Sequence, residues 1–234
     1  MEATKLQISG KALGALAMPD FCPRCFWLQQ KMKGLPYQIF PGIFSSIDSY
    51  TKKVVHKWFD DNGKAPEWLP ELADAKKYLP ALHHSKFRFV EPISGVTLTG
   101  AVDDLFELLD ETHAITDYKT AKYSDHQDQL LPIYEVQLNA YALIDEALGN
   151  KVSRLLLSYC EPVTGAEACT EDIYNEDGFA MGFCVKTITI KQDRETVIEL
   201  LIKARDIAEL ETAPERKCGC KECAKVDKLI GLAA

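Results

Sequence analysis

Five of the eight cysteines lie in two short clusters near the opposite ends of this 234-residue chain. The first cluster is Cys22-x-x-Cys25, and the second is Cys218-x-Cys220-x-x-Cys223. Two cysteine pairs with this spacing can enclose one metal ion when the segments that carry them fold against each other. The clusters therefore predict that the two ends of the chain meet at a structural metal site.

The residues alone leave the identity of this metal open between Zn²⁺ and an iron–sulfur cluster, because thiolates bind both. A zinc site would use the two complete pairs, which are Cys22, Cys25, Cys220 and Cys223. In a reducing compartment, cysteines at this density favour metal binding or burial over disulfides. In either case the metal would close a very long loop and stabilise the fold.

The length of the chain predicts a single domain over residues 1–234, since one sizeable core can be buried at this size. We expect its core at about 46–211 and the cysteine metal site in segments 20–35 and 212–226. No apolar run approaches the roughly 18–20 residues that span a bilayer, and the amino terminus has no secretory pattern. These features predict a cytoplasmic protein with no membrane partner. The net charge of −8 argues against a protein that coats nucleic acid, but it does not bear on catalysis.

Hydrophobic spacing predicts alternating helices and strands along the chain. We expect helices at 21–33, 46–63, 66–80, 133–148 and 194–211. We expect strands at 87–90, 96–103, 105–109, 114–119, 152–159 and 184–190. This order predicts one α/β domain with a sheet in its middle third.

Two carboxylates and a lysine stand out in the strand region. Asp117 and Lys119 alternate along a strand, so their side chains point to the same face. If the segment with Asp103 pairs beside them, two carboxylates and an ammonium converge, which is a setting that Mg²⁺ prefers. Such an ion would activate water and neutralise charge on a phosphate. The alternative is a solvated surface ion pair, which is common and contributes little.

Asp104 introduces an ambiguity of one residue beside Asp103. Adjacent residues of a strand point to opposite faces, so only one of the two can face the metal. We select Asp103 because of its distance from Gly100.

The chain resembles the RecB-like branch of the PD-(D/E)XK nuclease superfamily, and it is similar to CRISPR-associated spacer-processing exonucleases. The resemblance covers about residues 20–225. Its ordered motifs are Gly100-x-x-Asp103, Asp117-Tyr118-Lys119-Thr120 and Gln137-x-x-x-Tyr141, with His56 upstream and Cys22-Pro23-Arg24 near the start.

The resemblance implies a restriction-endonuclease-like fold, with a central mixed β-sheet flanked by helices. It implies that Asp103 and Asp117 bind a catalytic Mg²⁺ or Mn²⁺, helped by His56 and the carbonyl of Tyr118. Lys119 would assist the attack. For His56, a packed or surface histidine is an alternative.

The resemblance also implies roles for a helix and for the cysteines. Gln137 and Tyr141, which share one helix face at i, i+4 spacing, would line the substrate channel. Their alternative is an ordinary amphipathic helix. In the resembling branch, one N-terminal and three C-terminal cysteines bind a [4Fe–4S] cluster. In this chain that set would be Cys22, Cys218, Cys220 and Cys223.

The function implied is a metal-dependent DNA nuclease, acting as an exonuclease on single strands or DNA ends. Its context would be DNA processing, recombination or CRISPR adaptation, with a possible protein partner in a larger complex. An alternative is a catalytically silent nuclease-fold subunit that binds DNA or serves as a scaffold. A third hypothesis is a metal-binding adaptor in which the acidic motif is only surface.

Overall fold

The computed structural model describes residues 6–32, 42–123, 129–165 and 173–233. The helices in these ranges are α1 (Gly10–Gly14), α2 (Pro23–Lys31), α3 (Ile43–Asn62), α4 (Leu131–Ala147), α5 (Arg194–Ala208) and α6 (Lys221–Ala233), with 3₁₀ turns η1 (Ala15–Ala17) and η2 (Pro70–Leu72). The strands are β1 (Gln7–Ser9), β2 (Ala75–Leu79), β3 (Arg88–Val90), β4 (Thr97–Thr99), β5 (Asp104–Leu108), β6 (His113–Lys119), β7 (Val152–Pro162), β8 (Tyr174–Asn175), β9 (Gly178–Phe179) and β10 (Phe183–Thr189). Across these residues no helix has the length and apolarity needed to cross a bilayer.

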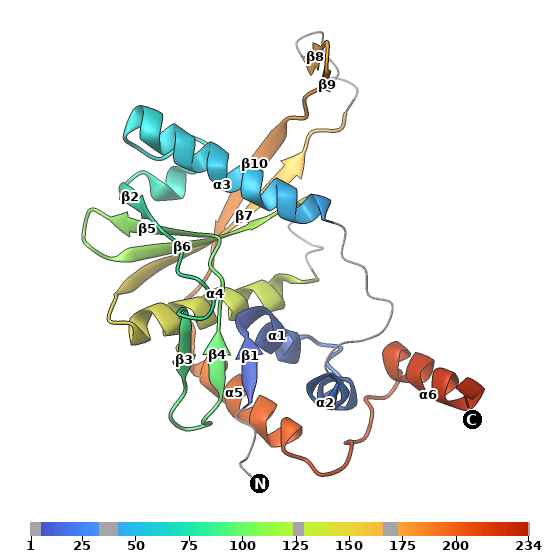
Figure 1. Ribbon diagram of the computed structural model, residues 1–234. Helices are drawn as coiled ribbons and strands as arrows, with labels where there is room; N and C mark the ends of the chain where they lie inside the picture. Colours follow the sequence, from blue (N-terminus) through green and yellow to red (C-terminus); the bar gives the residue numbers. More distant parts are fainter. Residues whose placement is uncertain (1–5, 33–41, 124–128, 166–172, 234) are drawn as a thin grey trace.

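A five-stranded sheet forms the centre of the molecule, in the order β10-β7-β6-β5-β2. β6 and β7 are parallel, whereas the other neighbours are antiparallel. Helix α3 lies over one face of this sheet and α4 lies over the other (Figure 1). The predicted central mixed sheet flanked by helices is therefore confirmed.

Strands β6 and β7 of this sheet are largely buried because both of their faces are covered. Ile115 of β6 and the run Leu155, Leu156 and Leu157 of β7 are fully buried. Side chains on one face of the sheet pack with α4 and α5, and those on the other face pack with Val55 of α3 and its neighbours. This two-sided burial holds the carboxyl end of β6 in a rigid setting.

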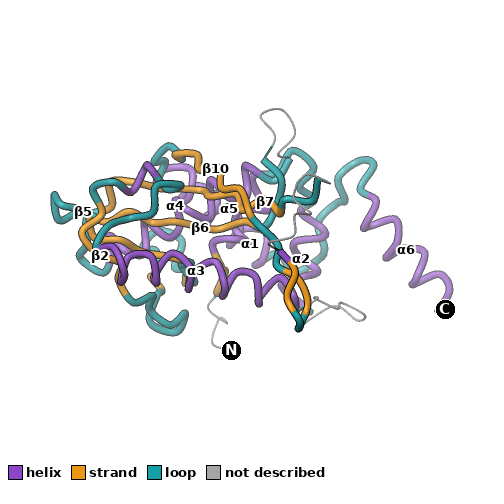
Figure 2. The backbone as a smooth tube through the Cα atoms, turned by 90° about the horizontal axis from the view of Figure 1, so that it is seen from above, coloured by secondary structure: helices purple, strands orange, loops and turns teal. Residues whose placement is uncertain are grey.

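A second, small sheet lies below α4, in the order β1-β4-β3. Helix α1 packs against α4 beside it, and α5 packs against both α4 and α2. Helix α6 packs against α2 and lies away from the large sheet, as Figures 1 and 2 both show. Helix α2, near the start of the chain, and helix α6, near its end, are therefore neighbours in space.

The prediction of a helix at 66–80 is wrong. This segment contains only the 3₁₀ turn η2, after which β2 pairs with β5 as an edge strand. Lys76 and Lys77 of β2 both bind the carboxylate of Glu107 on β5, at 2.8 and 2.9 Å. Pairing with a distant strand has overridden the local pattern, which is a common failure of propensity arguments. The helix α6 was not anticipated.

Candidate active site and cysteine metal site

Asp103, Asp117 and Lys119 lie together at the end of β6. The antiparallel register of β5 and β6 places Asp103 beside Asp117. The backbone N–H of Tyr118 donates to Oδ2 of Asp103 at 3.0 Å, and the Lys119 ammonium contacts Oδ2 of Asp117. The structure thus brings the two selected carboxylates and the lysine into one group.

Helix α4 contributes Gln137 and Tyr141 to the same group. Nε2 of Gln137 donates to Oδ1 of Asp117 at 2.9 Å and to the hydroxyl of Tyr141 at 2.7 Å. Both side chains are buried, and their i, i+4 spacing places them on the helix face that meets the sheet. Gln137 therefore orients Asp117 directly.

The carboxyl of Asp117 is buried in a setting that disfavours its charged form. Burial raises the pKa of its carboxyl to about 7, and the Lys119 ammonium, which acts in the opposite direction, does not compensate. The neighbouring Asp103 carboxyl adds to the rise. A divalent cation between these carboxylates would offset both the burial and the repulsion, so the donor set fits a hard, oxygen-binding ion.

Asp48 and Lys52 of α3 are two members that the sequence argument did not place in this group. Lys52 Nζ lies 2.7 Å from Oδ1 of Asp103. Burial and then the charge of Asp103 raise the pKa of Asp48. The signal was helical spacing: positions 48 and 52 continue the stripe of Val55 and Phe59, which face the sheet.

His56 is the predicted ligand that the structure does not bring to Asp103 and Asp117. Its Nε2 lies 2.6 Å from Oδ1 of Asp104, and its ring stacks on Tyr78 with the centroids 4.1 Å apart. The hydrogen bond to Asp104 raises the pKa of His56. His56 thus belongs to a polar cluster on the α3 side of the sheet, opposite Asp117.

The two cysteine clusters meet, as predicted. The sulfur atoms of Cys22, Cys25, Cys220 and Cys223 all lie within 4.8 Å of one another. Cys22 and Cys223 are buried, whereas Cys218 is exposed and lies outside this group. Of the five cysteines considered, the structure therefore selects the two complete pairs.

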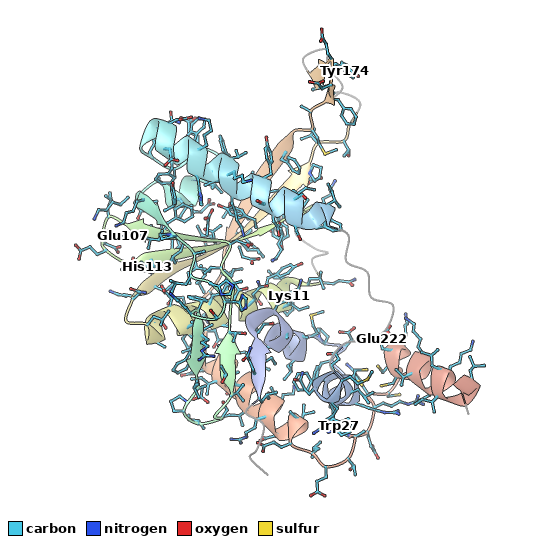
Figure 3. All side chains as sticks on the ribbon, viewed as in Figure 1. Lys11, Trp27, Glu107, His113, Tyr174 and Glu222 are labelled. Atoms are coloured by element: carbon cyan, nitrogen blue, oxygen red, sulfur yellow. The ribbon has the colours of Figure 1, made fainter. Side chains whose placement is uncertain are left out.

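Local structure presents these thiols from two helix starts. Cys22 precedes α2, whose first residue is Pro23, a residue favoured at that position. Cys220 precedes α6, after a turn in which Gly219 has φ +75°, a conformation that favours glycine. Figure 3 shows sulfur atoms between α2, where Trp27 is labelled, and the start of α6, where Glu222 is labelled.

The family model of the PD-(D/E)XK nuclease superfamily matches residues 22–226. No curated protein matches the sequence significantly. A solved structure titled "Crystal structure of SSO0001" superposes with a TM-score of 0.42 at 14% identity, covering 97% of this chain and 87% of the other. That degree of likeness carries no argument about activity.

Proposed function

The chain belongs to the PD-(D/E)XK nuclease superfamily, and from this premise we propose that it is a metal-dependent DNA exonuclease acting on single strands or DNA ends. The convergence of Asp103, Asp117 and Lys119 at the end of β6 is the observation that carries the proposal. The order of the motifs supports the RecB-like branch. Its setting would be DNA processing in the cytoplasm, such as recombination or CRISPR adaptation.

We assign the catalytic Mg²⁺ or Mn²⁺ to the carboxylates of Asp103 and Asp117 and to the backbone carbonyl of Tyr118. We propose Asp48 for the position that the resemblance gave to His56, because the charge of Asp103 acts on its carboxyl whereas His56 binds Asp104. When bound, such an ion activates water and polarises the phosphate. Three carboxylates suit an ion that prefers oxygen ligands.

The surrounding side chains position the reacting groups. The Lys119 ammonium touches Asp117 and lies 4.8 Å from the centroid of the Tyr134 ring, so it is held beside the metal ligands. We propose that it stabilises negative charge that develops on the phosphate. Gln137 keeps Asp117 in place, and Gln137 and Tyr141 border the path of the substrate.

A catalytically silent DNA-binding or scaffolding subunit is the second candidate, and one observation favours it. Lys52 pairs with Asp103 and Lys119 pairs with Asp117. Each of these carboxylates thus has a cationic partner from the protein itself. A site that holds no metal would be stabilised by such pairs, whereas a working site must release Lys52 when the metal binds.

Degradation of end-labelled DNA separates the two candidates. Single- and double-stranded substrates, labelled at either end, are incubated with Mg²⁺, Mn²⁺ or EDTA. The variants Asp117→Asn and Lys119→Ala are compared with wild type. Lys57→Ala is the matched control, because Lys57 is an exposed lysine of α3 that pairs with Asp61.

We expect the wild-type protein to cleave DNA and EDTA to abolish this cleavage. In each active-site variant the cleavage rate should fall by roughly 100-fold or more, as is typical when a contact to the transition state is removed. Lys57→Ala should match wild type, and the label that is released reports the polarity. If the folded wild-type protein cuts no substrate with either metal, the silent subunit becomes the function.

A further inference from the structure

The distances between the four thiol sulfurs indicate which kind of metal centre they can hold. The Sγ–Sγ distances are 3.7 Å for Cys22 and Cys223, 3.5 Å for Cys25 and Cys220, and 3.3 Å for Cys25 and Cys223. Four thiolates at about 2.3 Å from one tetrahedral ion lie about 3.8 Å from each other, from the geometry of the tetrahedron. The thiols therefore enclose a space for a single ion.

An iron–sulfur cubane needs a larger enclosure. In a [4Fe–4S] cluster each cysteine binds its own iron, and inorganic sulfides hold the irons apart. The four cysteine sulfurs must then surround an eight-atom core instead of one ion. The observed thiols, all within 4.8 Å of one another, leave no room for that core.

The cysteine set that the resemblance implies for a [4Fe–4S] cluster also disagrees with the structure. The [4Fe–4S] set that the resemblance implies includes Cys218 and omits Cys25. In the structure Cys218 is exposed, whereas Cys25 is in contact with both Cys220 and Cys223. The iron–sulfur cluster of the resembling branch is therefore not supported by the residues present.

We propose that Cys22, Cys25, Cys220 and Cys223 bind one Zn²⁺ ion in a tetrahedral, closed structural site. The coordination shell is supported by a backbone donor, because the N–H of Lys217 points to Sγ of Cys22 at 3.4 Å. Such outer contacts orient the ligands of structural metal sites. Cys218 is not a ligand.

The ion joins segments that are far apart in the sequence. Cys22 and Cys223 are 201 residues apart, and α6 packs mainly on α2. Near the metal, Asp227 of α6 binds Arg24 and Arg216, each at 2.9 Å. Because such exposed pairs contribute little, the ion is the main attachment of α6 to the rest of the fold.

Elemental analysis of the full-length protein tests the proposal. The protein is purified with and without oxygen, and zinc, iron and acid-labile sulfide are measured per chain. Apoprotein is then reconstituted with Co²⁺, whose absorption reports tetrahedral thiolate coordination. Cys25→Ser and Cys218→Ser are compared, and they form a matched pair because they remove a ligand and a non-ligand.

We expect one zinc per chain, little iron or sulfide under either atmosphere, and tetrahedral cobalt spectra. Cys218→Ser should keep the full metal content, whereas Cys25→Ser should lose it. Stoichiometric iron and sulfide in anaerobic protein would overturn the proposal, and so would metal loss in Cys218→Ser. The second outcome does not depend on whether Cys25→Ser folds. No readout uses DNA cleavage, so the result is independent of the proposed nuclease function.

Discussion

Asp103 and Asp104 are adjacent in the chain, and both bind the same residue, Tyr118, one through its backbone and the other through its side chain. Asp103 accepts a hydrogen bond from the Tyr118 backbone N–H, and Asp104 accepts one from its hydroxyl at 2.9 Å. Alternation along a strand produces this split. One carboxylate thus joins Asp117, and the other joins His56.

The two neighbouring carboxylates should respond differently to the same substitution. Asp103→Asn should reduce metal-dependent cleavage by roughly 100-fold or more, because a metal ligand is lost. Asp104→Asn should retain the metal requirement and lower the free energy of unfolding by about 1–3 kcal/mol, because a charged hydrogen-bond partner of His56 is removed. Cleavage rates and urea unfolding measure the two effects. If Asp104→Asn abolished metal binding while Asp103→Asn did not, our choice between the residues would be wrong.

Asp48 and His56 form a second matched pair, on the same helix. Asp48→Asn should increase the Mn²⁺ concentration needed for half-maximal cleavage by roughly 10-fold or more, as is typical when a metal site loses a supporting group. His56→Gln should leave that concentration unchanged and lower the melting temperature, because His56 contacts Asp104 and Tyr78 and not Asp103 or Asp117. Mn²⁺ titrations of activity and of heat of binding provide the measurement. The opposite pattern would return His56 to the metal.

Truncation of the Asn139 side chain in α4 should lower the free energy of unfolding more than truncation of most other polar side chains. Its side chain is buried and donates to the carbonyls of Glu135 and Lys191, each at 3.0 Å. Its oxygen accepts from the N–H of Asp193 and from Arg194. Asn139→Ala would leave several of these partners without a hydrogen bond, so we expect a loss of about 2–4 kcal/mol in the free energy of unfolding.

The control for Asn139 is Asn62→Ala, at the exposed end of α3, where the side chain makes one bond to the Trp58 carbonyl. Its cost should remain within about 0.5 kcal/mol, as for most surface substitutions. Denaturant midpoints at equal slope compare the two variants. Similar costs would contradict the network described for Asn139.

Gly14 tests the close packing of α1 on α4. A Cβ at this position would lie 2.5 Å from the carbonyl oxygen and 2.8 Å from the Cα of Ile133, and backbone atoms cannot turn away. Gly14→Ala should therefore destabilise the protein by about 1–3 kcal/mol. Gly231→Ala, in α6 with nothing within 4 Å, should be neutral or stabilise by up to about 1 kcal/mol. Equal effects in thermal unfolding would argue against the observed approach of α1 and α4.

Much of the fold could be predicted because its signals are local. The helix at 133–148 and the apolar strand at 152–159 correspond to α4 and β7, since spacing and apolar runs report how each element is covered. Gly149, which follows that helix, has φ +97°, a conformation that favours glycine. The segment at 66–80 failed because Lys76 and Lys77 take their structure from a partner strand.

For the candidate site, too, the features that could be predicted are those of short segments. Residue type and alternation were sufficient to nominate Asp117 and Lys119 on one face. The family resemblance nominated Gln137 and Tyr141, and their i, i+4 spacing places them on one helix face. Cysteine spacing was sufficient to predict that the chain ends meet. These are properties of short segments, so they can be read without knowing where each segment packs.

Only the tertiary structure decided which distant segments share a site. It placed Asp48 and Lys52 near Asp103, set His56 against Asp104, and left Cys218 outside the thiol group. Each of these outcomes depends on how a helix is rotated and docked, which is determined by packing summed over the whole core. Spacing within one helix shows which residues share a face, but it cannot show what that face will meet.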